Sequence, residues 1–127
     1  NELSIDSKYR PIFLKLSPDE SEDQLISICN SIKTFKVDGV ICTNTSTQLD
    51  NKHGSGGVSG KPLGEVSSRV IRSVRKYAGD DLPIIASGGV MNKEDYQEKL
   101  DSGADLVQIY TGFIYEGPSL ISDILEI

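Results

Sequence analysis

Short apolar runs alternate with longer amphipathic stretches along most of the chain. The apolar runs have the length and the β-branched content of buried strands, and they occupy residues 12–16, 37–43, 82–87 and 104–110. Between the first two runs, Leu25, Ile28, Cys29 and Ile32 fall on one face at helical spacing. Strand and helix patterns that alternate in this way predict a parallel sheet with right-handed crossovers.

Local signals place the ends of the predicted helices. Ser17-Pro18-Asp19-Glu20 combines a hydroxyl cap, a first-turn proline and two acids, so we expect a helix from there to about Phe35. A second helix is predicted over 65–77. Asn92 with Asp95 predicts the start of a third, which ends near Gly103. Pro118 opens a last helix through Ile127.

These elements make about four βα units, which are half of a (β/α)8 TIM barrel. A whole barrel of this kind typically needs about 250 residues, whereas this chain has 127. An open four-unit sheet is the alternative, but its edge and its second face would then need cover. The predicted fold class is therefore α/β, as half of a TIM barrel; the resemblance described below implies that it is the C-terminal half. Residues 11–127 form the half-barrel, and residues 1–10 form a polar tail or incoming loop.

Composition excludes several classes of function. The net charge of −6 argues against a nucleic-acid partner, and no apolar run approaches the roughly 18 residues of a membrane span. We expect the chain itself to be soluble. Cys29 and Cys42 match no zinc or redox spacing and are interpreted as reduced core residues. The single histidine, His53, lies in a polar loop, where we expect it to be exposed and without a catalytic role.

Glycine-rich segments follow the predicted strands and indicate a ligand site. The long polar loop of residues 44–62 contains Ser55–Gly60, Ser87-Gly88-Gly89 follows the third strand, and Tyr110-Thr111-Gly112 ends the fourth. Glycines at strand ends allow a ligand to approach the backbone, and exposed N–H groups favour phosphate. The pattern predicts a phosphate-bearing cofactor at the C-terminal face of the sheet.

Five ordered motifs make the chain resemble a known enzyme family. They are FLKLSPD (13–19), DGVICTNT (38–45), GGVSGKPL (56–63), PIIASGGV (83–90) and VQIYTGF (107–113). Together they resemble dihydroorotate dehydrogenase, in its quinone-dependent, membrane-associated class 2. The resemblance extends from Pro11 to Ile127 and concerns the C-terminal half of that family.

The resemblance implies an FMN cofactor and a site for dihydroorotate or orotate. The implied cofactor-binding residues are Lys15, Thr43, Ser59, Gly60, Ser87, Gly88, Gly89, Tyr110 and Thr111, and the implied substrate-binding residues are Asn44 and Thr45. Lys15 lies inside an apolar strand, where we expect it to be buried, and a buried lysine needs a partner or a ligand. The resemblance implies that it places positive charge near the flavin. The alternatives are that Lys15 reaches out to solvent and that Asn44 only forms a turn.

The resemblance also implies functions outside this chain. In the family, the first half carries the catalytic base, further flavin contacts, and the helices that bind quinone and the bacterial or mitochondrial inner membrane. We therefore expect no catalytic base and no metal site here, and no turnover by the chain alone. The expected partner is the N-terminal half of the barrel or a second copy of the chain. Another FMN-dependent barrel oxidoreductase and a non-catalytic phosphate-binding half-barrel remain alternatives.

Overall fold

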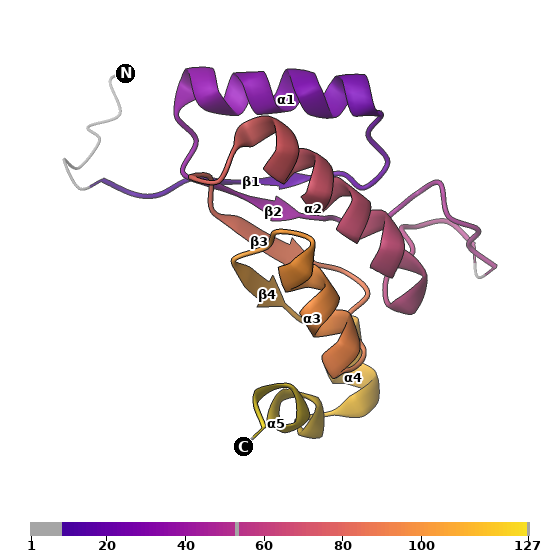
Figure 1. Cartoon of the computed structure of the whole chain (residues 1–127). Coiled ribbons are helices and arrows are strands. Elements are labelled where there is room, and N and C mark those ends of the chain that lie inside the picture. The colour runs from indigo at the N-terminus through magenta and orange to yellow at the C-terminus, as the bar shows by residue number, and fades with distance from the viewer. Residues whose placement is uncertain (1–8, 53, 127) are drawn as a thin grey trace, which may run out of the picture.

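The computed structural model describes residues 9–52 and 54–126. Residues 1–8 of the predicted tail, His53 and Ile127 lie outside this part. The elements are β1 (Phe13–Leu16), α1 (Glu22–Phe35), β2 (Gly39–Cys42), η1 (Lys61–Leu63), α2 (Gly64–Ala78), β3 (Ile84–Ser87), α3 (Lys93–Asp101), β4 (Leu106–Gln108), α4 (Thr111–Glu116) and α5 (Ser119–Leu125). The strands form one parallel sheet in the order β1-β2-β3-β4 (Figure 1). The predicted α/β class with four βα units is confirmed.

One face of the sheet is buried under the helices. Val40 pairs with Leu14 and Ile84, and Cys42 pairs with Leu16 and Ala86. Of these residues, all except the exposed Leu14 pack against α1 and α2, which lie on the same side of the sheet (Figure 1). The core comprises Leu16, Leu25, Cys29, Ile32, Val40, Cys42, Val70, Ile71, Val74, Ile84, Ala86 and Ala104. Both cysteines are free and buried, as predicted.

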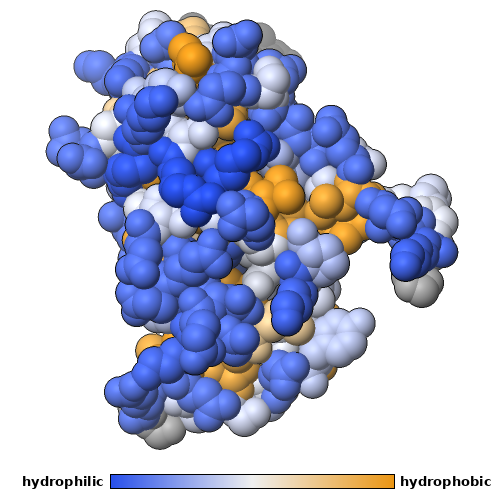
Figure 2. All heavy atoms as spheres, turned by 45° about the vertical axis from the view of Figure 1, so that its right-hand side comes forward, coloured by the Kyte–Doolittle hydropathy of each residue, from blue (hydrophilic) through white to orange (hydrophobic). Residues whose placement is uncertain are grey.

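The other face of the sheet remains largely open. Its middle row runs Lys15–Ile41–Ile85–Leu106 across the four strands. Leu106 is 63% exposed and Phe13 is 38% exposed, although both are apolar strand residues. Exposed apolar residues on one sheet face indicate a surface that another part of a protein covers. Figure 2 shows apolar side chains at the base of the projecting β2–α2 loop, and smaller apolar groups among mostly hydrophilic ones elsewhere on that face.

The first helix begins later than its sequence predicts. Ser21, not Ser17, caps α1, and its side chain accepts a hydrogen bond from the backbone of Gln24 while the Gln24 side chain accepts one from Ser21. This reciprocal capping box satisfies two backbone donors. Ser17 instead accepts a hydrogen bond from the backbone N–H of Asp19 in a turn. The Ser17 prediction was wrong, because Pro18 and Asp19 form a turn and the Asp19 carboxylate is bonded to Ser46 and Thr47.

The C-terminal region contains a helix that the sequence did not predict. We expected a strand over 104–110, but β4 ends at Gln108 and Tyr110 is the N-cap residue of α4. The third and last helices agree better with expectation. Asn92 caps α3 by accepting from the backbone of Asp95, and Pro118 precedes α5. The predicted strands were generally too long, because apolar residues continue beyond the paired segment into the turns.

Candidate functional site

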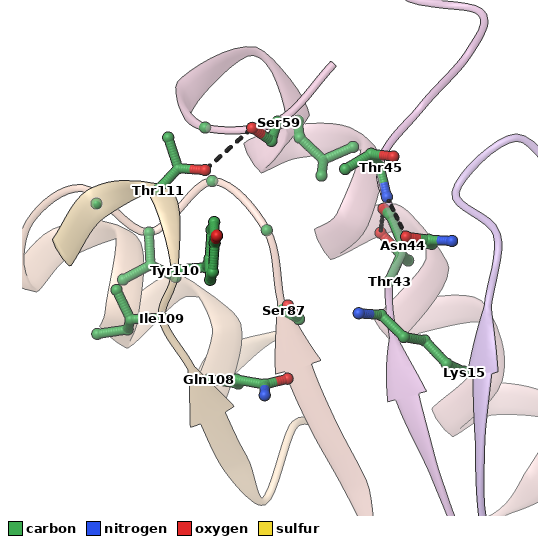
Figure 3. Close-up of a pocket in the computed structure, with 16 residues that line it drawn as sticks. Lys15, Thr43, Asn44, Thr45, Ser59, Ser87, Gln108, Ile109, Tyr110 and Thr111 are labelled. Carbon is green, nitrogen blue, oxygen red and sulfur yellow. Dashed lines mark hydrogen bonds between the residues drawn. The ribbon is translucent and has the colours of Figure 1, made fainter. Parts of the chain in front are cut away.

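A cavity of about 190 Å³ lies at the carboxyl ends of the four strands (Figure 3). All of the residues predicted for the site from the sequence line it. They are Lys15, Thr43, Asn44, Thr45, Ser59, Gly60, Ser87, Gly88, Gly89, Tyr110 and Thr111. Parallel strands end at the same edge of a sheet, so residues distant in sequence meet there. Among the described residues along this cavity, Lys15 carries the only charge, which favours an anionic ligand.

Lys15 lies on the open face of the sheet. It pairs with Ile41 in register, and its ammonium group points into the cavity in Figure 3. The side chain is exposed in this structure, so the expectation of a buried lysine was wrong. The reason is the strand's alternation: Leu16 is buried against the helices, and its neighbour Lys15 must point to the other face.

Thr43, Asn44 and Thr45 form an irregular segment directly after β2. Thr43 is buried, and its hydroxyl donates to the backbone oxygen of Asn44 at 2.8 Å. The side-chain oxygen of Asn44 accepts from the backbone N–H of Thr45 at 2.9 Å. Asn44 thus makes a local side-chain contact, but residues 43–45 are irregular and form no turn, so the alternative that Asn44 only forms a turn is not supported. Its side chain is exposed at the cavity, and its amide nitrogen donates to no group that the structure describes. The Cys42–Thr43 peptide bond is cis.

The Gly88-Gly89 turn requires glycine at both positions. The φ angles are +115° and +82°, a region that L-residues with side chains rarely adopt. A Cβ atom at Gly89 would lie 2.2 Å from the Cα of Gly64, at the start of α2. A Cβ atom at Gly88 would lie 2.7 Å from Leu63. Within residues 9–52 and 54–126, the backbone N–H groups of Gly89 and Val90 have no acceptor, and both residues line the cavity.

The β2–α2 loop reaches across to the end of β4. The hydroxyl of Thr111 donates to the Ser59 hydroxyl at 3.0 Å, which closes the cavity on that side (Figure 3). Gly60 has φ +71°, and a Cβ there would lie 3.0 Å from the Thr111 methyl group. Gly60 therefore permits this close approach. Two hydroxyl groups from distant segments thus meet at one wall of the cavity.

Asp19 holds the base of that loop, a role that sequence reasoning missed. Its carboxylate accepts from the Ser46 hydroxyl, and from the backbone N–H and hydroxyl of Thr47 at 2.7 and 3.0 Å. Partial burial raises the pKa of Asp19, but these hydrogen bonds outweigh it and hold the pKa below the ordinary value. Ser46 also pairs with Val58 in an antiparallel bridge. We interpreted Asp19 as part of a solvated helix start. The only sequence signal for a role near the cavity was its position four residues after Lys15.

Several other lining residues were also missed: Leu63, Val90, Gln108 and Ile109. Gln108 has a clear signal in hindsight. It pairs with Ser87 in register, and it lies two residues from Leu106 on the open face. Period-two alternation back from Tyr110 would have placed its amide on the cavity side of the sheet.

Comparison with known proteins identifies relatives for nearly the whole chain. The family model for dihydroorotate dehydrogenase matches residues 3–127. The chain is 46% identical over 122 residues to a dihydroorotate dehydrogenase (quinone) from Paracidovorax citrulli, and 48% identical over 120 residues to one from Christiangramia forsetii. Each alignment covers 91% of this chain, and 34% and 35% of the respective relative.

The fold comparison agrees with the sequence comparison. The ligand-free crystal structure of DHODH from Eimeria tenella matches with a TM-score of 0.84 and 31% identity, over 92% of this chain and 34% of that one. The same enzyme in complex with ferulenol gives a TM-score of 0.83. The chain thus spans about a third of the length of the relatives that it matches. By its sequence and its fold, this chain belongs to the dihydroorotate dehydrogenase family.

Proposed function

We propose that this chain supplies the FMN- and substrate-binding part of a quinone-dependent dihydroorotate dehydrogenase, an enzyme of pyrimidine biosynthesis. The enzyme would oxidise dihydroorotate to orotate. One observation carries the proposal: residues chosen from separate sequence motifs line a single cavity at the carboxyl edge of the sheet. Family membership favours this activity over that of another FMN-dependent barrel oxidoreductase.

The residues of the cavity fit FMN. Gly88 and Gly89 let the turn pack directly against Leu63 and the start of α2, where a Cβ would clash, and the N–H groups of Gly89 and Val90 are free to donate within the described structure. Together with the hydroxyls of Ser59 and Thr111, they would hold the phosphate. Thr43, Gly60, Ser87 and Tyr110 would complete the cofactor site. When bound, FMN would supply the hydride acceptor for dihydroorotate oxidation.

The chain's own side chains would orient the two ligands. Lys15 would stabilise negative charge on the flavin, since its ammonium is the only charge among the described cavity residues. The amide nitrogen of Asn44 would donate to a ring carbonyl of the substrate, while its oxygen stays bonded to Thr45. Thr45 would contribute its exposed hydroxyl to the same ligand.

We propose that the remaining functions come from sequence outside this chain. The family resemblance assigns the proton-abstracting base, the quinone contacts and the membrane attachment to its N-terminal half. Within residues 9–52 and 54–126, no helix is long and apolar enough to cross a membrane. The open sheet face, with Phe13 and Leu106 exposed, supports the closure of a (β/α)8 barrel by further strands or by a second copy of the chain.

A flavin spectrum tests the proposal. The natural polypeptide that carries this sequence is purified, and its visible absorption and its thermal unfolding with and without orotate are recorded. We expect near-stoichiometric flavin that is released as FMN, and a higher unfolding temperature with orotate. A flavin-free protein that neither binds added FMN nor responds to orotate would refute the proposal. The 127-residue chain alone is expected to show no dihydroorotate oxidation, and turnover by it would refute the placement of the base outside this chain.

A further inference from the structure

Lys99 is a buried cation whose ammonium group contacts the start of a neighbouring helix. It belongs to α3 and is 1% exposed, yet no carboxylate within the described residues forms an ion pair with it. Its Nζ atom donates to the Gly64 carbonyl oxygen at 2.6 Å, and to the Ser67 and Ser68 hydroxyls at 2.7 Å each. An ammonium group has three donors, and all three are satisfied.

Helix stability does not explain this arrangement. All three acceptors lie in the first turns of α2, where the helix dipole disfavours a positive charge. Burial also lowers the pKa of Lys99, although nearby carboxylates, that of Glu98 first among them, oppose the shift. A buried charge in an unfavourable place calls for a compensating role.

The Ser67 hydroxyl connects Lys99 to the Gly88-Gly89 turn at the cavity. Its oxygen lies 3.0 Å from the carbonyl oxygens of both Gly64 and Gly88. Because Lys99 donates to the Ser67 oxygen, the single hydroxyl proton must point to one of these two carbonyls. Lys99 already donates to Gly64 at the shorter distance of 2.6 Å. Donation of the Ser67 proton to the carbonyl oxygen of Gly88 gives each of the two carbonyl oxygens a donor.

The Gly88 carbonyl and the Gly89 N–H belong to the same peptide group. That group is planar and trans, so its oxygen and its N–H point in opposite directions. Neither glycine has a side chain to hold the turn, and both adopt φ angles open to many conformations for glycine. A hydrogen bond that fixes the oxygen of Gly88 thus fixes the direction of the N–H of Gly89, which has no acceptor among the described residues.

We infer that Lys99 is a positioning residue that acts through Ser67 to aim the Gly89 N–H at the phosphate of the flavin cofactor. The inference rests on the proposed function, because it concerns the same cavity and its FMN ligand. Lys99 itself touches neither the cavity nor the ligand. Its three hydrogen bonds hold the start of α2, on which the Gly88-Gly89 turn packs.

Ser67→Ala and Ser68→Ala form a matched pair that tests this role. Both serines are buried in α2, and each variant leaves Lys99 with two acceptors. Of these two serines, only Ser67 forms a hydrogen bond with Gly88. The natural polypeptide that carries this sequence is freed of flavin and titrated with FMN and with riboflavin, which has no phosphate, while flavin fluorescence is followed.

We expect Ser67→Ala to lower FMN affinity about tenfold, which corresponds to about 1.4 kcal/mol. Ser68→Ala should change it less than about twofold, and riboflavin affinity should change by less than about twofold in both variants. Lys99→Met should lose FMN affinity to the same extent as Ser67→Ala. If the Lys99→Met variant does not fold, the comparison of Ser67→Ala with Ser68→Ala tests the inference. Equal loss of FMN affinity in the two serine variants, or equal loss of FMN and riboflavin affinity in Ser67→Ala, would overturn the inference. Absence of FMN binding by the unsubstituted protein would overturn the proposed function instead.

Discussion

Gly89→Ala is expected to damage the site through a contact with the backbone of α2. An alanine Cβ at this position would lie 2.2 Å from the Cα and 2.4 Å from the nitrogen of Gly64. An ordinary carbon contact is about 3.5–4.0 Å, so the turn and the helix start would have to separate by more than about 1 Å. Backbone atoms cannot change rotamer to relieve such a clash, so the shift must propagate into the first turn of α2.

Two terms contribute to the loss of stability. Alanine at φ +82° costs about 1–3 kcal/mol in backbone strain. Forcing an extra methyl group into a packed contact typically costs a further 1–3 kcal/mol or so. Gly117 separates these terms, because it has φ +71° and a Cβ there would meet no atom within 4 Å. Gly117→Ala should therefore show the strain alone.

Urea unfolding of the natural polypeptide and of both variants measures the difference. We expect the free energy of unfolding of Gly89→Ala to lie about 1–3 kcal/mol below that of Gly117→Ala, with similar m-values. FMN affinity should fall in Gly89→Ala and stay within about twofold of the unsubstituted protein in Gly117→Ala. Equal destabilisation of the two variants would refute the reasoning, because it would mean that the Gly89–Gly64 contact carries no steric constraint.

Other predictions concern single side chains. Lys15→Ala should weaken FMN binding by about 10- to 100-fold, as expected for a lost charge-assisted hydrogen bond, and should slow flavin reduction in stopped-flow measurements. Asn44→Ala should weaken orotate binding more than FMN binding in calorimetric titrations, and the reverse ranking would contradict the assigned roles. The depressed pKa of Asp19 stabilises the fold above the ordinary carboxyl value of 3.8, and this contribution is lost as the pH falls through the folded-state pKa. Asp19→Asn should therefore flatten the acid limb of stability against pH in urea titrations. Burial raises the pKa of Cys42 to about 12, so iodoacetamide should label this thiol at neutral pH only after unfolding. Labelling of Cys42 in the native state, at the rate seen in urea, would contradict this burial.

The sequence was sufficient to predict the elements that bury one face. Val40 and Cys42 are buried on either side of the half-exposed Ile41 in a short apolar strand, and Leu25, Cys29 and Ile32 recur at helical spacing. Such patterns reflect burial directly, so they predict the strand and helix types well. Element ends were less predictable, because Ser17 and Ser21 both offer a hydroxyl cap within four residues. Ser17 with Glu20 and Ser21 with Gln24 both fit the capping-box pattern, and only the structure shows that the second pair forms the reciprocal bonds.

Exposure on the open face was the main misjudgement. Lys15 was expected to be buried because its neighbours in the strand are apolar, yet it is exposed together with Leu106. A strand that is buried on both faces in a complete barrel has the same apolar sequence when the part that covers its second face is absent. The sequence pattern therefore predicts the environment of a completed barrel, whereas the exposure of these residues describes this chain alone.

The membership of the cavity could be predicted because it depends on topology. Four parallel strands in sequential order bring their carboxyl ends to one edge, so the residues that follow each strand must meet there. The support beneath the cavity could not be predicted in this way. Lys99 reaches Ser67 through the packing of α3 against α2, and neither residue belongs to a glycine motif or follows a strand. Lysine in a polar helix is normally a solvated residue, and only its three buried acceptors distinguish it. The backbone groups that would contact the phosphate can therefore be located from strand ends, whereas the groups that aim them depend on side-chain contacts between helices.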